Sequence, residues 1–171
     1  MNYNIDLMEK PPKLKFSQKT KCNLLLPYLT KKQKILDLGC GNMWLTKTLR
    51  YKGYNCKGFA LDPPADILAN VKTYPFKSKY YDVVIALEMI EHVNCFKEIK
   101  KMLKPGGLLI LSTPVPHLDW LCNIGEKVGL MQPRGTPHSH LFYVKDVPFK
   151  PILTRILFGI VQFGVFKNSK D

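Results

Sequence analysis

A short apolar segment followed by a glycine-containing turn constrains this 171-residue chain more than any other feature. The segment Lys34–Leu38 (KILDL) is apolar apart from its first residue and Asp37, and Gly39 and Gly41 follow it directly. Such a run predicts a buried strand, and the glycines allow a ligand to approach the backbone closely. Next, Asn42–Tyr51 places large apolar residues at helical spacing. The sequence therefore predicts a strand, a glycine turn and a helix, which together begin a βαβ unit.

The same alternation of strands and helices continues along the chain. Apolar segments predict further strands at Cys56–Leu61, Asp66–Val71, Asp82–Leu87 and Leu108–Thr113, and amphipathic spacing predicts helices over residues 17–29 and Asn94–Leu103. Alternating strands and helices imply right-handed crossovers and a mainly parallel sheet. We therefore predict a compact Rossmann-like α/β fold with six to seven strands and helices on both faces of the sheet.

The length suits a single domain. Its expected parts are a basic, loosely held arm over residues 1–20, a core over residues 34–114 and an atypical C-terminal part over residues 115–171. In the last part, residues 151–166 predict a helix that begins at Pro151 and a strand over about Ile160–Phe166. The alternative for this apolar segment is contact with a membrane surface or a second copy, because lysines flank it. The oligomeric state stays open.

The formal net charge of +13 raises the question of nucleic-acid binding, since clustered cations bind phosphates. Only three of the basic residues are arginines, which are the preferred partners for phosphate, and the lysines are scattered. We therefore expect a solvated lysine-rich surface rather than a dedicated nucleic-acid groove. The five cysteines form no C-x-x-C pair, and the N-terminus has no apolar core of a secretory signal. A cytoplasmic protein without a transmembrane segment is the expectation.

A second acidic residue supports a nucleoside-binding site beside the glycine turn. Asp62 ends the next predicted strand, 25 residues after Asp37. This is about where an acid that binds ribose hydroxyls lies in a Rossmann unit. A dinucleotide-binding dehydrogenase carries G-x-G-x-x-G, whereas Trp44 stands in place of its third glycine here.

Several motifs together carry a family resemblance over about Lys34–Pro114. LDLGCG, Asp62, YDVVIALEMIEHV and LKPGGLLILSTP occur in the order and spacing of the class I S-adenosylmethionine-dependent methyltransferases. The chain most resembles the small type 11 group that includes ubiquinone-pathway O-methyltransferases. The resemblance implies S-adenosyl-L-methionine as cofactor and a methyl-transfer activity. The cofactor-binding residues that it implies are Asp37, Gly39, Cys40, Gly41, Asp62, Pro63 and Leu87.

Three departures from the family pattern stand near this site. The usual third glycine is Met43, so we expect a more hindered turn. The helix that normally follows the second strand is almost missing, because Asp66 comes only four positions after Asp62. The acid that often meets the adenine amino group has no clear counterpart, with Asn70 or Val71 standing near its place.

The acceptor side is predicted just past the strand Asp82–Leu87. Glu88, Glu91 and His92 have the spacing of one helical face. We predict His92 as the catalytic base, with Glu91 beside it, and Glu88 as a substrate contact. The alternative is that the Glu-His pair only caps the following helix. His140, in the loop PRGTPHSHLFYV, is a second predicted substrate contact, and a surface histidine is its alternative.

Three functions remain open from the sequence. The first is methyl transfer to a small-molecule acceptor. The second is RNA methylation, because Glu88, Glu91, His92 and a later histidine also resemble the metal-binding set of small-RNA 2′-O-methyltransferases. The third is a non-enzymatic protein that keeps the cofactor fold. With no recognisable RNA-binding module, we favour the first and predict that no metal is needed.

Overall fold

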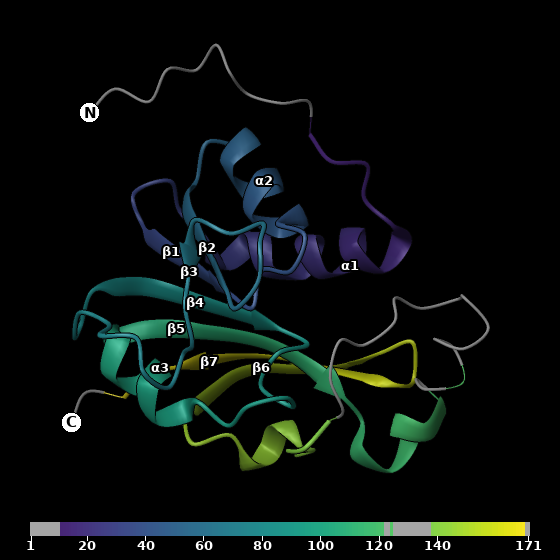
Figure 1. Cartoon of the computed structure of the whole chain (residues 1–171). Coiled ribbons are helices and arrows are strands. Elements are labelled where there is room, and N and C mark those ends of the chain that lie inside the picture. The colour runs from purple at the N-terminus through teal and green to yellow at the C-terminus, as the bar shows by residue number, and fades with distance from the viewer. Residues whose placement is uncertain (1–10, 122–123, 125–137, 170–171) are drawn as a thin grey trace.

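A computed structural model describes residues 11–121, 124 and 138–169, and these form one seven-stranded sheet (Figure 1). The strand order is β3-β2-β1-β4-β5-β7-β6, with β7 antiparallel to both of its neighbours and the other described pairs parallel. The predicted α/β fold is confirmed, and the sheet has the larger of the two predicted strand numbers. The strands are β1 (Lys34–Leu38), β2 (Asn55–Ala60), β3 (Ile67–Leu68), β4 (Tyr81–Leu87), β5 (Leu103–Pro114), β6 (Lys150–Leu157) and β7 (Val161–Lys167).

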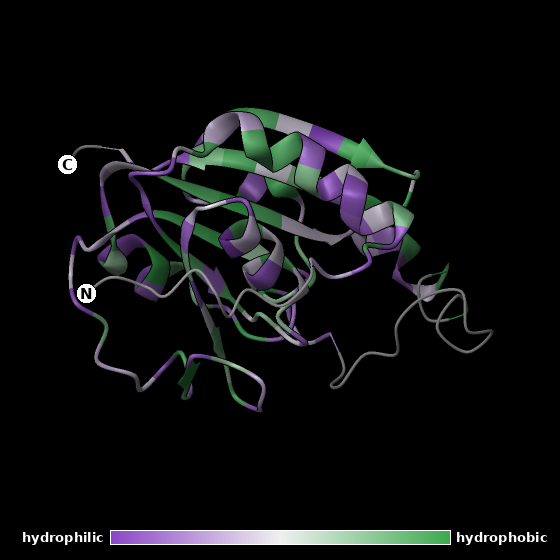
Figure 2. Cartoon of the chain, turned by 90° about the horizontal axis from the view of Figure 1, so that it is seen from above, coloured by the Kyte–Doolittle hydropathy of each residue, from purple (hydrophilic) through white to green (hydrophobic). Residues whose placement is uncertain are grey.

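Helices cover both faces of the sheet, as predicted. The helix α1 (Phe16–Leu25) and the helix α2 (Trp44–Tyr51) pack on one face, whereas α3 (Phe96–Met102) packs on the other (Figure 1). Hydrophobic residues dominate the central strands, whereas the helices alternate between polar and apolar residues (Figure 2). Each helix therefore buries one stripe against the sheet. Short 3₁₀ turns lie at Leu26–Tyr28, Pro116–Leu118 and Val144–Asp146, and the described residues 119–121 and 124 are helical.

Two sequence predictions about the ends of the chain are wrong. The loosely held arm cannot extend to residue 20, because α1 begins at Phe16 and buries Cys22 and Leu25 in the core. The helix expected from Pro151 is instead the strand β6, which pairs along its length with β7. Phe158 and Gly159 both have positive φ angles, of 54° and 73°, as a type I′ hairpin turn requires. Tertiary pairing with β7 thus overrides the local helix preference.

The connection between β2 and β3 holds no helix, which agrees with the sequence prediction. Asp66 closes this short connection instead. Its backbone N–H donates to the Gly58 carbonyl over 3.0 Å, and its Oδ2 accepts the Gly58 N–H over 2.6 Å. Arg50 of α2 forms an ion pair with the same carboxylate. A single acid therefore joins β2, β3 and α2 where a helix would otherwise space them.

The strand β6 forms one edge of the sheet and exposes apolar side chains. Ile152 and Ile156 are exposed on this strand, and Phe158 is exposed at the hairpin turn. Among the described residues, no helix has the length and apolar character needed to cross a membrane.

Candidate active site

The glycine turn after β1 is built around a buried carboxylate. Asp37 is 3% exposed, and the Thr46 hydroxyl of α2 donates to its Oδ2 over 2.7 Å. Burial raises the pKa of Asp37 to about 6, and the hydrogen bond from Thr46 partly offsets the shift. Asp37 therefore ties the end of β1 to the first turn of α2. This contact fixes the turn between them.

Backbone hydrogen bonds hold the turn against β2. The N–H groups of Gly39 and Cys40 both donate to the Phe59 carbonyl, over 2.8 and 3.1 Å. The buried Cys40 thiol also lies 3.7 Å from the Pro64 carbonyl, a distance suited to a weak sulfur hydrogen bond. The glycine turn and the segment that follows β2 are thus joined at one edge of the sheet.

The two glycines of the turn are needed for different reasons. Gly39 has a φ of 78°, and a Cβ there would lie 2.4 Å from Cγ of Met89, so its missing side chain makes room for Met89. Gly41 has a φ of 50°, and a Cβ there would meet no atom within 4 Å. Met43 takes the left-handed conformation, with a φ of 61°, and its buried side chain points toward Gly58 of β2. Open space therefore lies beside Gly41, where a ligand can approach.

The other residues predicted for the cofactor lie at the same edge. Since β1, β2 and β4 are parallel neighbours, their carboxyl ends meet there. Asp62 and Pro63 are exposed just past the end of β2, and the half-buried Leu87 ends β4. The carboxyl edge of a parallel sheet is where ligands bind in open α/β folds.

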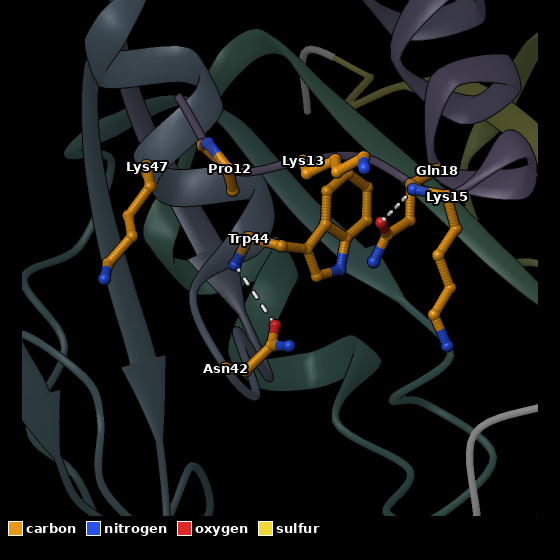
Figure 3. Close-up of a pocket in the computed structure, with 7 residues that line it drawn as sticks. All are labelled: Pro12, Lys13, Lys15, Gln18, Asn42, Trp44 and Lys47. Carbon is orange, nitrogen blue, oxygen red and sulfur yellow. Dashed lines mark hydrogen bonds between the residues drawn. The ribbon is translucent and has the colours of Figure 1, made fainter. Parts of the chain in front are cut away.

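A cavity of about 430 Å³ borders the start of α2 (Figure 3). The Trp44 indole stands among lysine and glutamine side chains from the segment before and within α1 (Figure 3). The backbone N–H of Trp44 donates to Oδ1 of Asn42 over 3.3 Å. Three ammonium groups give this space a positive charge. Its lining residues are Pro12, Lys13, Lys15, Gln18, Asn42, Trp44 and Lys47.

The Glu88–His92 segment is a turn rather than the helical face that the spacing suggested. Glu88 has a φ of 54°, the His92 N–H donates to the Met89 carbonyl, and α3 begins only at Phe96. The N-cap residue of α3 is Cys95, and no side chain caps that helix. Capping of α3 therefore does not explain the Glu-His pair.

Glu91 is fully buried, and neither carboxylate oxygen has a hydrogen bond of regular geometry with a described residue, although the Thr113 hydroxyl lies near enough to lower its pKa slightly. Burial raises its pKa to about 8, and the neighbouring Glu88 carboxylate adds to the shift. The hydroxyls of Ser112 and Thr113, at the end of β5, are also buried without a partner among the described residues. Buried polar groups without partners are rare in folded proteins and often mark functional sites.

Glu88 forms an ion pair with Lys21 of α1. The Lys21 side chain is 7% exposed, whereas that of Glu88 is 47% exposed. An ammonium group from the N-terminal helix is thus inserted beside the end of β4. This pairing of Lys21 is not predictable from the sequence, because nothing in the local pattern distinguishes Lys21 from the other lysines around it.

His138 brings its ring to this turn, whereas His140, the predicted substrate contact, meets the turn through its backbone. The His138 ring contacts the His92 ring at a centroid separation of 4.8 Å, and its Nδ1 lies 2.7 Å from Oδ1 of Asp119. His140 is exposed, although its backbone N–H donates to the Glu91 carbonyl. Asp119 was also missed, since its link to His138 depends on tertiary contact.

Three groups in this cluster carry atoms that can ligate metal ions. Glu91, His92 and His138 each bring one such atom to within 4.8 Å of the other two. Glu88, the other acid of the motif, is instead paired with Lys21. Burial raises the pKa of Glu91 to about 8, so an ion that bound through this carboxylate would have to displace a proton and would bind more weakly as the pH falls.

Comparisons with known proteins agree with this architecture. The family model described as a methyltransferase domain matches residues 15–146. A ubiquinone biosynthesis O-methyltransferase of Bradyrhizobium diazoefficiens is 30% identical over 77% of the chain and 61% of its own length. A tRNA U34 carboxymethyltransferase of Nautilia profundicola is 28% identical over 88% of the chain and 53% of its own length. The chain therefore spans about three-fifths or less of these relatives.

Solved structures show the same fold. An S-adenosylmethionine-dependent methyltransferase of Methanosarcina mazei superposes with a TM-score of 0.64 at 16% identity, over 86% of this chain and 98% of its own. Its identity is low, so this likeness shows the fold alone. Because the family model covers most of the chain and the strand order agrees with that fold, the chain belongs to the methyltransferase-domain family, within the class I S-adenosylmethionine-dependent superfamily.

Proposed function

We propose that the chain transfers a methyl group from S-adenosylmethionine to a hydroxyl group of a small-molecule acceptor. The observation that carries this proposal is the pairing of two features at one sheet edge. The open glycine turn lies at the end of β1, and the buried cluster around Glu91 lies past the end of β4. The ubiquinone O-methyltransferase similarity supports an oxygen acceptor.

The residues present fit the cofactor. The open space beside Gly41 leaves room for the methionine portion, and the ammonium groups of Lys13 and Lys15 suit its carboxylate. The exposed Asp62 carboxylate can accept both ribose hydroxyls. Cys40, Pro63 and Leu87, with Asp37 and Gly39 behind the turn, would line the rest of the site.

On the acceptor side, we propose roles for the turn after β4. His92 would contact the acceptor hydroxyl and share in its deprotonation. Glu91, held neutral by burial, would donate a hydrogen bond, because a protonated carboxyl is a donor. Glu88 and His140 are exposed enough to contact the acceptor, with Lys21 orienting Glu88.

Replacement of Asp62 by alanine tests the cofactor site. We expect the variant to bind S-adenosylmethionine and S-adenosylhomocysteine more weakly by roughly 1–3 kcal/mol, through loss of charged hydrogen bonds. Calorimetry with both ligands measures the change. Asp66→Ala is not a fair control, since Asp66 holds β2 and β3 together, so Asp146→Ala, on an exposed turn, serves instead. If the wild-type chain produces no heat or thermal shift at millimolar ligand, the enzymatic function is wrong.

We also expect methyl transfer to need no added metal. Elemental analysis of protein purified without chelator should find no stoichiometric ion, and titration with manganese should leave activity unchanged within about twofold. The physical reason is that Lys21 already neutralises Glu88 and that Glu91 favours its protonated form. Stoichiometric metal that disappears in the double variant His92→Ala, His138→Ala would contradict this expectation.

RNA is a second candidate acceptor, because a tRNA-modifying enzyme is among the relatives and lysines surround Trp44. An indole can stack on a base while ammonium groups meet phosphates. If the lysines are mainly solvated surface, RNA binding should be weak and should fall steeply as salt rises. Fluorescence anisotropy with a labelled tRNA at two salt concentrations measures this. Tight binding that survives physiological salt would favour RNA over a small molecule.

A further inference from the structure

Lysines gather at the edge of the sheet that lies opposite the candidate active site. The six parallel strands begin at this edge, and β7, which runs the other way, ends there. Ten lysines lie at these strand ends or in the segments just before them, and we call this set the lysine rim: Lys31, Lys32, Lys34, Lys52, Lys77, Lys79, Lys101, Lys104, Lys150 and Lys167. We propose that the lysine rim docks the chain on an anionic phospholipid surface.

Contacts between side chains join the rim across the starts of β2, β1 and β4. The Lys31 ammonium lies 4.0 Å from the ring centroid of Tyr54, just before β2. The Lys34 ammonium, at the start of β1, lies 4.2 Å from the ring centroid of Tyr80, just before β4. Lysines that are scattered in the sequence are therefore neighbours in the folded chain.

The rim continues over β5, β7 and β6. The Lys104 ammonium lies 2.6 Å from Oδ1 of Asp82, and Lys167 is packed beside Gly106, at the turn before the central part of β5. Lys150 lies directly opposite Lys167 in the β6–β7 ladder, and neither forms an ion pair with a described residue. Like charges in this position repel each other. An external anion at the rim would relieve this repulsion.

Acidic residues lie mainly at the other edge. Among the described residues, Asp82 is the only acid at the lysine rim. The carboxyl ends of β1, β2 and β4 and the turns after them carry Asp37, Asp62, Glu88 and Glu91. A negatively charged surface would therefore attract the chain by the rim and orient it. The carboxyl edge would then face away from the membrane and stay open to the cofactor and a small-molecule acceptor.

The chemistry of the rim favours phospholipid over RNA. Every cation in it is a lysine, whereas arginine is the preferred partner for bidentate recognition of phosphate in nucleic acids. Stacking on bases needs an open aromatic face. Lys34 and Lys77 both lie over the Tyr80 ring, at 4.2 and 5.4 Å from its centroid, so ammonium groups already occupy this ring.

An apolar side chain stands within the rim. Ile152 is 48% exposed and lines a cavity of about 300 Å³ together with Lys104, Lys167 and the Gly106–Gly107 turn. An apolar side chain among ammonium groups suits the boundary between lipid headgroups and acyl chains. The rim therefore offers both kinds of contact that a peripheral membrane surface uses.

Co-sedimentation of the full chain with large unilamellar vesicles tests the inference. We expect wild type to bind vesicles of equimolar phosphatidylcholine and phosphatidylglycerol but not vesicles of phosphatidylcholine alone, and sodium chloride should weaken this binding. The triple variant Lys32→Gln, Lys150→Gln, Lys167→Gln should bind the mixed vesicles roughly 10²-fold more weakly, because each lysine near an anionic surface strengthens binding about fivefold. These three side chains are exposed and form no ion pair with a described residue.

A second triple variant is the matched control. Lys19→Gln, Lys57→Gln, Lys97→Gln removes the same charge from exposed positions away from the rim, and it should change vesicle binding by less than about threefold. Both variants should unfold at the same urea concentration as wild type and bind S-adenosylhomocysteine with the same affinity. These two measurements show that the chain is folded and that the carboxyl edge is intact.

The outcomes separate this docking surface from a general effect of charge and from the proposed function. Equal losses of vesicle binding in the two triple variants would show that net charge alone matters, and the inference would be wrong. It is also wrong if wild type ignores the mixed vesicles, and binding of a labelled tRNA through the same three lysines would then identify RNA as the occupant. A wild-type chain that binds mixed vesicles but not S-adenosylhomocysteine would overturn the proposed function and leave this inference standing.

Discussion

Raising the pH from 6 to 9 is expected to destabilise the wild-type chain relative to Glu91→Gln by about 2–3 kcal/mol. The carboxyl of Glu91 has an ordinary pKa of 4.5 in the unfolded chain and one of about 8 when buried. Folding therefore favours the protonated form. The contribution of Glu91 to the free energy of unfolding is complete below about pH 4.5, and it is lost as the pH rises from there through 8. Glutamine keeps the size and stays neutral, so its variant escapes this loss.

Urea unfolding at pH 6, 7, 8 and 9 measures the difference. Asp37 also has a raised pKa, of about 6, but its contribution changes mainly below pH 7 and is common to both proteins. Glu98→Gln is the matched control, because pairing with Lys72 lowers the pKa of Glu98 and leaves nothing to titrate above pH 6. If wild type and Glu91→Gln lose stability in parallel over this range, Glu91 is ionised in the folded chain and its proposed role as a donor is wrong.

Much of the fold was predictable because local patterns and tertiary structure agree over the first part of the chain. The prediction for β1 coincides with the strand, since a continuous apolar run that ends in glycine fits a strand buried on both faces. The C-terminal hairpin was not predictable in the same way. Its turn contains Phe158, a residue not expected at positive φ, so the hairpin signal was hidden and β6 was taken for a helix.

The same difference between local motifs and tertiary contacts decides which residues of the candidate site were predictable from the sequence. Asp37 and Gly41 could be placed at the end of β1 from the sequence, because short, ordered motifs set their positions next to a strand end. The contacts that Lys21 makes with Glu88 and that His138 makes with His92 and Asp119 join segments remote in the sequence, and no local pattern predicts them. Even Glu91 was recognised only by its motif. Its burial and its raised pKa depend on β5 and on the loop that carries His138.

Alanine substitution at the two turn glycines should destabilise the chain to different extents, because their surroundings differ. In Gly39→Ala the new Cβ would lie 2.4 Å from Cγ and 2.8 Å from Cβ of Met89, which is too close for either atom. The alanine would also have to adopt a φ of 78°. We expect a loss of roughly 2–4 kcal/mol of unfolding free energy. In Gly41→Ala only the φ cost applies, about 1–2 kcal/mol, but the Cβ would enter the space proposed for the cofactor.

A double-mutant cycle distinguishes crowding by Met89 from the cost of the positive φ at Gly39. Met89→Ala removes Cγ, so Gly39→Ala should cost less in that background by about 1–2 kcal/mol, whereas Gly41→Ala should cost the same in both backgrounds. Urea unfolding gives the four free energies, and calorimetry with S-adenosylhomocysteine gives the affinities. We expect Gly41→Ala to bind S-adenosylhomocysteine at least tenfold more weakly than wild type. Its cost in unfolding free energy should be nearly the same with methionine or alanine at position 89. A Gly41→Ala chain that binds as tightly as wild type would show that the open space beside this glycine is not the cofactor site, whatever the cycle at Gly39 gives.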